Sequence, residues 1–571
     1  MFYRYFSRSH RRDWLVSIVF LFTIYFSLIY GLPTDNPFMP HDDDLFIGQA
    51  LSISLGDWLG EDYGKFTLIK GPYHSIQVWL SSVVGVPPLL GLRLFYAATC
   101  ALFCSVALYR LPTFLKSLAF VCLLFDPVLI GTSSSWRLLR EASFVPVEVL
   151  ALACGIYTLD TIVLIGSNHR PSLSIKSHKT LWISLLSSYF CLGLLLITRE
   201  ARIVIIFTSL VYTFILILYA YKYRFLTPKA FLKLVPLVLA LLLAFNLPVV
   251  SVKALNYMNY GLAISNEFEE GGFKSFYQNL SSVKLAKTVH QPSIPIKKDA
   301  IEAIVALDPD SQLAITLSNL NPGWTIHGCK INKDWCDEYS SGWFMWALRD
   351  AIFKTSSVDS PGDFQDQVLI LSQELVQVCA SNPKVLSCQT SSFGYLPYPS
   401  RWVPKGQSPF KLFSDIALAH LTWLTSPSPL ANYSAVTHNY EQSRSVGVWL
   451  TSGYTPAELK TFRQRIANLN QFSSLIRMGL FISFASIVLV IIFWKPRLIV
   501  CLFDPGLVLI GTLLLINFLV IVLVEVTSFP SGGYLSMVSP LTTLFIWRYY
   551  DRLSINFNSK SSTNFNDLTS V

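Results

Sequence analysis

Residues 203–221, IVIIFTSLVYTFILILYAY, form an uninterrupted run without a charged side chain. A helix needs about 20 such residues to cross a hydrocarbon core of about 30 Å, so the run predicts a membrane span. Similar runs recur, and only 14% of the residues are charged, against roughly 25% in ordinary soluble domains. We therefore predict an all-α polytopic membrane protein with about ten transmembrane helices. The predicted spans are 14–32, 92–109, 117–131, 142–165, 181–197, 203–221, 232–250, 476–494, 505–527 and 533–548.

Basic residues beside these runs set the predicted orientation. Arginines precede the first span, lysines and arginines occupy alternate short loops, and Arg548 and Arg552 follow the last span. Cytoplasmic loops are enriched in Lys and Arg, so we place both termini in the cytoplasm and interpret the first run as an uncleaved span. This placement explains the net charge of +9 without a nucleic-acid partner. The chain shows no ER retention signal, which favours a bacterial inner (plasma) membrane.

The apolar segment 76–90, IQVWLSSVVGVPPLL, tests this path. Counting it as a span would invert every later loop and place the basic loops outside. The segment is short and is interrupted by Gly85, Pro87 and Pro88, and proline breaks helices. We therefore predict a helix that lies in the outer interface of the membrane, within a first outer loop covering 33–91.

The long segment between the seventh and eighth predicted spans contains no convincing span and is large enough to form its own core. Helical patterns at 342–352 and 363–380 predict a mixed, mainly helical extracytoplasmic domain. The predicted parts of the chain are a transmembrane module at 1–250, the inserted domain at 251–475, C-terminal transmembrane helices at 476–552 and a Ser/Asn-rich, disordered cytoplasmic tail at 553–571.

Four cysteines lie in the predicted inserted domain as two close pairs. An extracytoplasmic compartment permits disulfides, which favours the pairs Cys329–Cys336 and Cys379–Cys388. Free thiols are the alternative, and four cysteines allow three connectivities. A zinc site is disfavoured because no C-x-x-C spacing occurs.

Three consecutive carboxylates, Asp42, Asp43 and Asp44, follow the first span. Adjacent carboxylates raise one another's pKa by repulsion, which suits a cation site or a base near the membrane surface. The alternative is a solvated acidic turn that caps a helix predicted to begin near Leu45. Lys70 follows in the sequence Lys-Gly-Pro, where its point charge suits a phosphate group, and the alternative is a contact with a lipid headgroup.

Two further turns on the predicted outer side carry charges: Arg137, Arg140 and Glu141 in the first, and Arg199, Glu200 and Arg202 in the second. Charges at the ends of spans are costly to bury unless they are paired or functional. The two turns therefore predict a polar cavity that opens outward, with Arg137 and Arg199 as the favoured anion ligands. Local Arg–Glu pairing within each turn is the alternative.

Four acidic residues fall within or beside predicted spans. Asp126 and Asp504 each precede a proline, which predicts caps at helix breaks, whereas Glu148 and Glu525 have no assigned role. No nucleotide-binding loop, nucleophile elbow or zinc-protease motif occurs in a suitable context. The pattern argues against a nucleotide-driven pump, a nucleotide-binding enzyme and a zinc protease.

The layout of residues 1–250 resembles the GT-C glycosyltransferases, a superfamily that includes protein O-mannosyltransferases and lipid A aminoarabinose transferases. Residues 42–46 read D-D-D-L-F, which has the spacing of the family's D-E-x-x-Y/F motif with Asp43 in place of Glu. Residues 70–72 read K-G-P, where the family has K-P-P or H-P-P before an interfacial helix. Arg93 opens a span, as in the family.

The resemblance implies transfer of a sugar from a polyprenyl-phosphate donor to an acceptor hydroxyl on the extracytoplasmic face. The acceptor would be a glycan, a lipid or a protein, and the enzyme would work among membrane lipids. Asp42 would act as the general base that deprotonates the acceptor. Cations would stabilise the departing lipid phosphate. The expected phosphate-binding cations are Lys70, Arg137, Arg140 and Arg199.

The same resemblance gives the remaining acidic residues supporting roles. Asp43 either orients the acceptor or contributes to a divalent-cation site. We expect Asp44, Glu141 and Glu200 to hold the residues that contact the substrate in position. We expect no metal and no other cofactor.

Two other classes of protein remain open from the sequence. An O-antigen ligase or polymerase would depend on Arg and His residues of the large outer segment, for which the candidates are His327, Arg401 and His420. A transporter or receptor would need no catalytic base, but two similar halves, which transporters often show, are not evident. Tryptophans of the inserted domain offer sugar-stacking faces, although helical spacing favours core packing. They are Trp324, Trp335, Trp343 and Trp346.

Overall fold

The computed structural model describes residues 8–32, 34, 42–131, 136–167, 175–222, 228–285, 294–331, 333–388, 408–425, 447, 455–494, 503–527 and 537–566. Across these residues the chain is almost entirely helical, and their small sheet pairs β1 (Val283–Leu285) with β2 (Leu386–Cys388) in antiparallel register. Seven of the described helices are long and apolar enough to span a membrane. The predicted all-α, multi-pass membrane fold is therefore confirmed.

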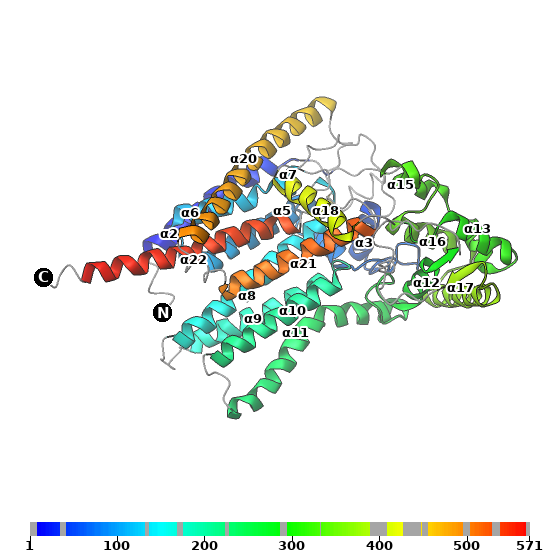
Figure 1. The fold of residues 1–571 in the computed structure, drawn as a ribbon, viewed down its shortest axis with the longest axis horizontal. Helices are drawn as coiled ribbons and strands as arrows, with labels where there is room; N and C mark the ends of the chain where they lie inside the picture. Colours follow the sequence, from blue (N-terminus) through cyan, green and yellow to red (C-terminus); the bar gives the residue numbers. More distant parts are fainter. Residues whose placement is uncertain are drawn as a thin grey trace.

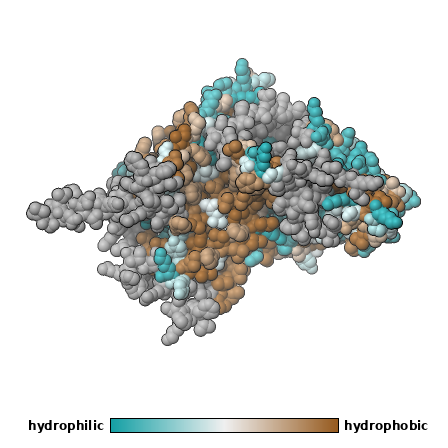
Figure 2. Space-filling view, viewed as in Figure 1, coloured by the Kyte–Doolittle hydropathy of each residue, from teal (hydrophilic) through white to brown (hydrophobic). Residues whose placement is uncertain are grey.

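Every predicted span coincides with a helix or a pair of helices. They are α2 (Arg8–Ile29), α5 (Pro88–Ala107), α6 (Thr113–Leu124) with α7 (Pro127–Gly131), α8 (Glu141–Ser167), α9 (Ile175–Leu196), α10 (Arg202–Lys222), α11 (Pro228–Tyr260), α20 (Pro456–Trp494), α21 (Pro505–Thr527) and α22 (Val538–Asn566). In Figure 1 these long helices run side by side as a bundle, and both ends of the chain lie at one end of it. Figure 2 shows apolar residues gathered over this bundle.

The break between α6 and α7 has the cause that the sequence predicts. Asp126 precedes Pro127, and its Oδ1 accepts a hydrogen bond from the Val128 N–H at 3.0 Å. Asp126 also forms a buried ion pair with Arg477 of α20 and accepts a hydrogen bond from Ser539 Oγ at 2.6 Å. A charge in a span is costly unless it is paired, so this contact ties α20 and α22 to the break.

Asp504 caps α21 in the same way, because its Oδ1 accepts a hydrogen bond from the Gly506 N–H at 3.1 Å. It also accepts one from Arg548 Nε at 3.2 Å. Arg548 Nη2 in turn donates to both oxygens of Asp160, at 2.7 and 2.9 Å, and Arg552 pairs with the same two aspartates. The two arginines after the last predicted span are therefore buried in ion pairs that hold α8, α21 and α22 together.

The C-terminal helix is longer than the sequence predicts. It continues to Asn566, through most of the segment 553–571 that we expected to be disordered. Residues 551–566 contain neither proline nor glycine, and extending an existing helix avoids the cost of a new nucleus. Local polarity therefore misled the prediction, because a packed helix precedes this polar segment.

The inserted domain is mainly helical, as predicted, and lies at the other end of the bundle (Figure 1). The predicted helices at 342–352 and 363–380 are α16 and α17, and the spans on both sides extend past the expected borders, α11 to Tyr260 and α20 from Pro456. The elements of this part are α12 (Gly271–Ser281), α13 (Lys298–Leu307), α14 (Gln312–Ser318), η2 (Pro322–Thr325), α15 (Ile326–Ile331), η3 (Lys333–Trp335), α16 (Ser341–Thr355), α17 (Pro361–Ser381) and α18 (Pro409–Thr425).

Two disulfides lie in the inserted domain, between Cys329 and Cys336 and between Cys379 and Cys388. These are the pairs that the spacing favours. The second disulfide links the end of α17 to β2 and so fixes the strand beside that helix.

Two large hydrophobic cores hold most of the buried apolar side chains of the described residues, and the first outer loop contributes to both. The first core is formed by the transmembrane helices. The second is the core of the inserted domain, and it includes side chains of the first outer loop. These are Leu45, Phe46, Leu59, Tyr63, Leu68 and Ile69. Ile47, Ala50 and Val78 of the same loop belong to the first core, so the loop joins the transmembrane helices to a domain that begins about 200 residues later.

The short helices of the first outer loop are α3 (Asp43–Leu55) and α4 (Tyr73–Val83). The predicted interfacial helix at 76–90 is thus a helix over its first half only. The chain turns at Gly85, whose φ of +69° favours glycine, and Pro88 starts α5 instead. Proline is well suited to the first turn of a helix, which explains why the second half joins the following span.

Candidate functional site

The first member of the candidate site is an ion pair between Asp42 and Lys70. Asp42 occupies the N-cap position of α3, but its side chain makes no capping hydrogen bond. The alternative of a simple capping turn is therefore wrong for Asp42, because its carboxylate accepts a hydrogen bond from Lys70 Nζ instead.

Aromatic rings enclose the Lys70 ammonium. Its Nζ lies 5.6 Å from the centre of the Phe46 ring and 5.2 Å from that of Trp346, which belongs to α16 of the inserted domain. Only 7% of Lys70 is exposed, so the alternative of a lipid-headgroup contact does not describe it. Burial lowers the pKa of Lys70, and Asp42 opposes that shift.

The second member of the candidate site is a bidentate ion pair between Asp43 and Arg137. Arg137 Nε donates to the carboxylate at 3.2 Å, and Nη2 donates to the same oxygen at 2.5 Å. Asp43 is almost fully buried, and burial raises its pKa to about 7, although Arg137 lowers it. The neighbouring charges of Asp42 and Asp44 raise it further, as the run of three aspartates predicts.

The remaining charges pair crosswise between the two outer turns. Arg140 Nη1 donates to both oxygens of Glu200, at 2.6 and 2.7 Å, and Arg199 Nη1 donates to Glu141 at 2.5 Å. Each turn therefore supplies an arginine to the other, and the alternative of local pairing is wrong. The exchange ties the start of α8 to the turn between α9 and α10.

These side chains form one electrostatic group. Burial would raise the pKa of Glu200, but Arg140 and Lys70 more than offset it, so the pKa lies below its ordinary value. Burial likewise opposes the charge on Arg140, yet Glu200 and Asp42 raise its pKa. Four cations thus face five carboxylates at the junction between the bundle and the inserted domain.

Arg202 pairs with carboxylates of a different segment from those that hold the other arginines. Its Nη2 pairs with Glu270 at 2.9 Å and with Glu269 at 3.5 Å, both from the segment that follows α11. Burial raises the pKa of Glu269 to about 7, with a smaller contribution from Glu200. The inserted domain therefore adds a carboxylate beside the site that no sequence motif pointed to.

His74 is a second residue of this neighbourhood that the sequence prediction missed. It lies four residues after Lys70, in the first turn of α4, is fully buried, and contacts the Phe46 ring edge-on at 4.8 Å between centroids. Its Nδ1 lies 2.6 Å from Ser143 Oγ on α8. The sequence carried a signal for it, since the stretch K-G-P-Y-H places a histidine four residues after the lysine.

We expect His74 to make the protein sensitive to acid. Burial lowers its pKa from an ordinary 6.5 to about 4, so between these values the unfolded chain binds a proton that the folded protein does not. Stability is therefore lost as pH falls through about 6.5 towards 4. A His74→Gln variant should lack this term, which amounts to about 2 kcal/mol at pH 5. Thermal unfolding of both proteins in detergent at pH 7 and pH 5 measures it; equal losses on acidification would contradict it.

The departure of Gly71 from the family motif has a packing reason. A Cβ atom at this position would collide with the backbone carbonyl of Ile197 at the end of α9, and the Tyr73 N–H donates to that same carbonyl at 3.5 Å. A proline, as in the K-P-P form of the motif, would meet the same obstacle. Glycine here lets Lys70 approach the turn that carries Arg199 and Glu200.

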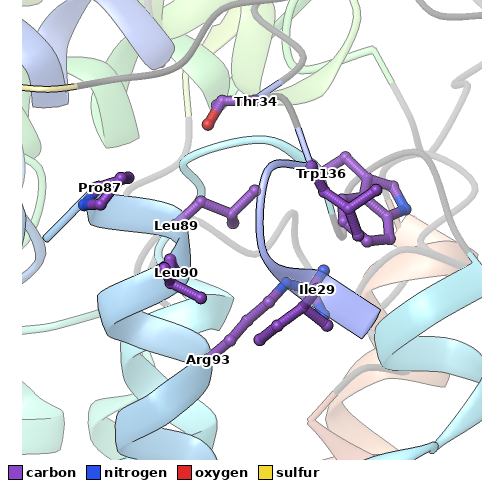
Figure 3. A pocket seen from close by; sticks show the side chains of 8 residues that line it. Ile29, Thr34, Pro87, Leu89, Leu90, Arg93 and Trp136 are labelled. Carbon is purple, nitrogen blue, oxygen red and sulfur yellow. The ribbon is translucent and has the colours of Figure 1, made fainter. Parts of the chain in front are cut away.

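The charged residues of the two turns pair with one another, and the outward-opening polar cavity expected from them stays a prediction. The cavity in Figure 3 lies beside them at the ends of α2 and α5 and is mainly apolar. Its polar features are Thr34 and Arg93, whose guanidinium lies 4.3 Å from the centre of the Trp136 ring. None of the paired cations and carboxylates of the two outer turns and the acidic run lines this cavity.

The residues that would mark a ligase behave differently. His420 is buried on α18 and contacts Phe518 of α21 edge-on at 6.3 Å between centroids, which is a packing role. Arg401 and the side chain of His327 lie outside the described residues. Trp324 and Trp346 are buried and stack on each other, so their faces belong to the core of the inserted domain.

A metal site has no clear ligand set in the part of the chain that the structure describes. No group of three or more His, Cys, Asp or Glu side chains there could hold an ion. The three aspartates do not converge, since Asp42 turns to Lys70 and Asp43 to Arg137. The absence of a cofactor remains a prediction.

Comparisons with known proteins give little beyond this geometry. No family model matches the sequence, and no curated protein matches it. Two solved structures of ArnT from Cupriavidus metallidurans are similar in fold, one in the apo state and one bound to undecaprenyl phosphate. They share 12% and 13% identity, cover 94% and 95% of this chain and 76% and 77% of their own, and have TM-scores of 0.30 and 0.29. A TM-score this low carries no functional argument.

Proposed function

We propose that the chain is a membrane glycosyltransferase that moves a sugar from a polyprenyl-phosphate donor to an acceptor hydroxyl at the extracytoplasmic face. The observation that carries this proposal is the pairing of Asp42 with Lys70. A carboxylate suited to act as a base contacts a buried ammonium suited to a phosphate, and both come from the two motifs that resemble the GT-C superfamily.

The pair suggests how a donor would enter. In this structure Lys70 neutralises Asp42. A donor phosphate that takes the ammonium would release the carboxylate, so binding of the donor would itself produce the free base. The Asp42 carboxylate is then free to act as a base only when a donor sugar is bound, which limits proton exchange in the absence of the donor.

The reaction is an inverting displacement at the anomeric carbon. The acceptor oxygen forms the new bond to that carbon, its proton passes to Asp42, and the bond from carbon to the phosphate oxygen breaks with its electron pair on the phosphate. Lys70 and the nearby guanidiniums stabilise the charge that develops on the leaving group. Because carboxylates already hold Arg137, Arg140 and Arg199 in position, these groups need little reorganisation during the step.

The chemical roles of the other acids follow from their partners. Asp43 holds Arg137, Glu200 holds Arg140 and Glu141 holds Arg199, so each is a positioning residue for a cation. Asp44 acts on Asp43 through its charge. We assign the acceptor to the class of glycan, lipid or protein hydroxyls, and the donor to sugars on a polyprenyl phosphate in the membrane.

Donor binding should depend on Lys70. Replacing Lys70 with Gln removes the charge that would meet the phosphate, so we expect undecaprenyl phosphate to bind at least about 10-fold more weakly, which is the size of one lost charge-assisted contact. Microscale thermophoresis with the purified protein in detergent measures the affinity for undecaprenyl phosphate. Lys65→Gln is the matched control, because Lys65 lies on the same loop with an exposed side chain that pairs with Asp350.

The outcomes separate the classes of function. Binding that is lost in Lys70→Gln and kept in Lys65→Gln supports a lipid-phosphate donor. Equal binding by wild type and both variants would place the phosphate elsewhere and remove the basis for the proposal.

A further inference from the structure

The inserted domain grips the first outer loop through one buried arginine, Arg349 of α16. The side chain of Arg349 has no exposed surface. Its Nε donates to the Lys65 carbonyl at 2.7 Å, and its Nη2 donates to the Thr67 carbonyl at 3.0 Å and to Tyr63 Oη at 3.3 Å. A guanidinium offers five donors in a fixed plane, and here most of them end on the loop.

Glu267 of the inserted domain contacts both Arg349 and the first outer loop. It forms a buried ion pair with Arg349, and its Oε1 accepts a hydrogen bond from Tyr63 Oη at 2.6 Å. Its backbone N–H donates to the Leu68 carbonyl at 2.8 Å. The aromatic ring of Phe364, 4.4 Å from the guanidinium, shields the pair from water. Residues 63–68 are therefore bound by main chain and side chain of the inserted domain.

The backbone held in this way is strained. Leu68 has a φ of +55°, a left-handed conformation that residues with a side chain rarely adopt. Leu68 precedes Lys70 by two residues, so its conformation sets the direction in which the lysine leaves the loop. The hydrogen bonds to the carbonyls of Thr67 and Leu68 come from Arg349 and Glu267 and hold the chain in this state.

Helix α16 also reaches Lys70 directly. Trp346 lies one turn before Arg349, and its ring lies 5.2 Å from Lys70 Nζ. Phe66 contacts the edge of Trp346 at 6.1 Å between centroids, so the loop, the lysine and the helix share one packed unit. Figure 1 shows α3 and α16 at the junction of the bundle and the inserted domain.

We infer that Arg349 is a positioning residue through which the inserted domain sets Lys70 opposite Asp42. The donor-phosphate site is then built jointly by the first outer loop and a helix encoded about 280 residues later. Its value for transfer rests on the proposed function, but the placement of Lys70 does not. The experiment therefore measures the two separately.

The first arm measures the accessibility of Lys70. Trinitrobenzenesulfonate modifies exposed amines, and mass spectrometry reports the rate at each lysine. In wild type Lys70 should react slowly, since it is buried and paired. In Arg349→Met we expect its rate to rise at least about 10-fold, while the exposed Lys298 of α13 stays unchanged as an internal reference. Lys354→Met, an exposed position on the same helix, is the matched control and should leave the Lys70 rate unchanged.

A second variant covers the case in which Arg349→Met does not fold. Glu267→Gln keeps the shape, the backbone N–H and an acceptor for Tyr63, and removes only the charge that opposes Arg349. We expect the same increase at Lys70 to a smaller degree, with a normal elution profile. An unchanged Lys70 rate in a folded variant, from either substitution, overturns the inference.

The second arm measures binding of undecaprenyl phosphate by the same variants. Faster labelling of Lys70 together with donor binding weakened about 10-fold supports both the inference and the proposed function. Faster labelling with unchanged binding supports the positioning role and counts against Lys70 as the phosphate ligand. Arg349→Lys should restore less than half of the wild-type protection, since a single ammonium cannot reach acceptors on two sides at once.

Discussion

Asp42→Asn should lower the rate of sugar transfer by about 10²- to 10⁴-fold, the usual contribution of a general base. Asparagine keeps the size and the hydrogen-bonding oxygen of aspartate but cannot take a proton from the acceptor. Donor binding should survive, because the substitution removes the carboxylate that competes with the phosphate for Lys70. A loss of kcat with donor affinity unchanged or improved is therefore the expected signature.

The matched control for this result is Asp44→Asn, which changes an adjacent carboxylate of the same run and leaves the Asp42–Lys70 pair in place. Transfer to an acceptor by the purified enzymes, at saturating donor, gives the comparison. Near wild-type activity in Asp42→Asn would remove the base from the mechanism. Equal losses in the two variants would indicate that the charge of the loop matters and not one particular proton acceptor.

The crosswise pair of Arg140 and Glu200 should have a large effect on stability. Removing one partner of a fully buried ion pair costs about 3–5 kcal/mol because the other charge is left without compensation. The side chains of Arg140 and Glu200 are 13% and 23% exposed, so we expect a cost below that range. We therefore expect Arg140→Glu and Glu200→Arg each to unfold at much lower temperature than wild type. The double exchange restores opposite charges across the same 2.6 Å contact and should recover most of the loss.

Tryptophan fluorescence during heating in detergent provides the four unfolding midpoints of this cycle. Effects that simply add would show that the two residues do not interact. Transfer activity should stay low in the double exchange even if stability returns, because a glutamate would then occupy the place of a proposed phosphate ligand. That split separates the role of Arg140 in folding from its role toward the donor.

Several features of this protein follow from short stretches of sequence. The run at 203–221 and its counterparts predict the spans, because a helix in lipid satisfies its own backbone and needs only apolar side chains of sufficient number. The caps at Asp126 and Asp504 follow from the proline after each. The short spacing of the cysteines favoured the disulfides that form. All of these depend on residues close together in the chain.

The sequence also identified the charged residues of the candidate site, but it did not identify their partners. Hydropathy and local spacing were enough to predict the helices, the acidic run and the lysine motif. The packing of distant segments brings Arg140 to Glu200, Gly71 to the end of α9, and Arg349 to the loop before Lys70. These contacts join segments 60 to about 280 residues apart. Their geometry is set by how the helices and the inserted domain pack, which no local pattern specifies.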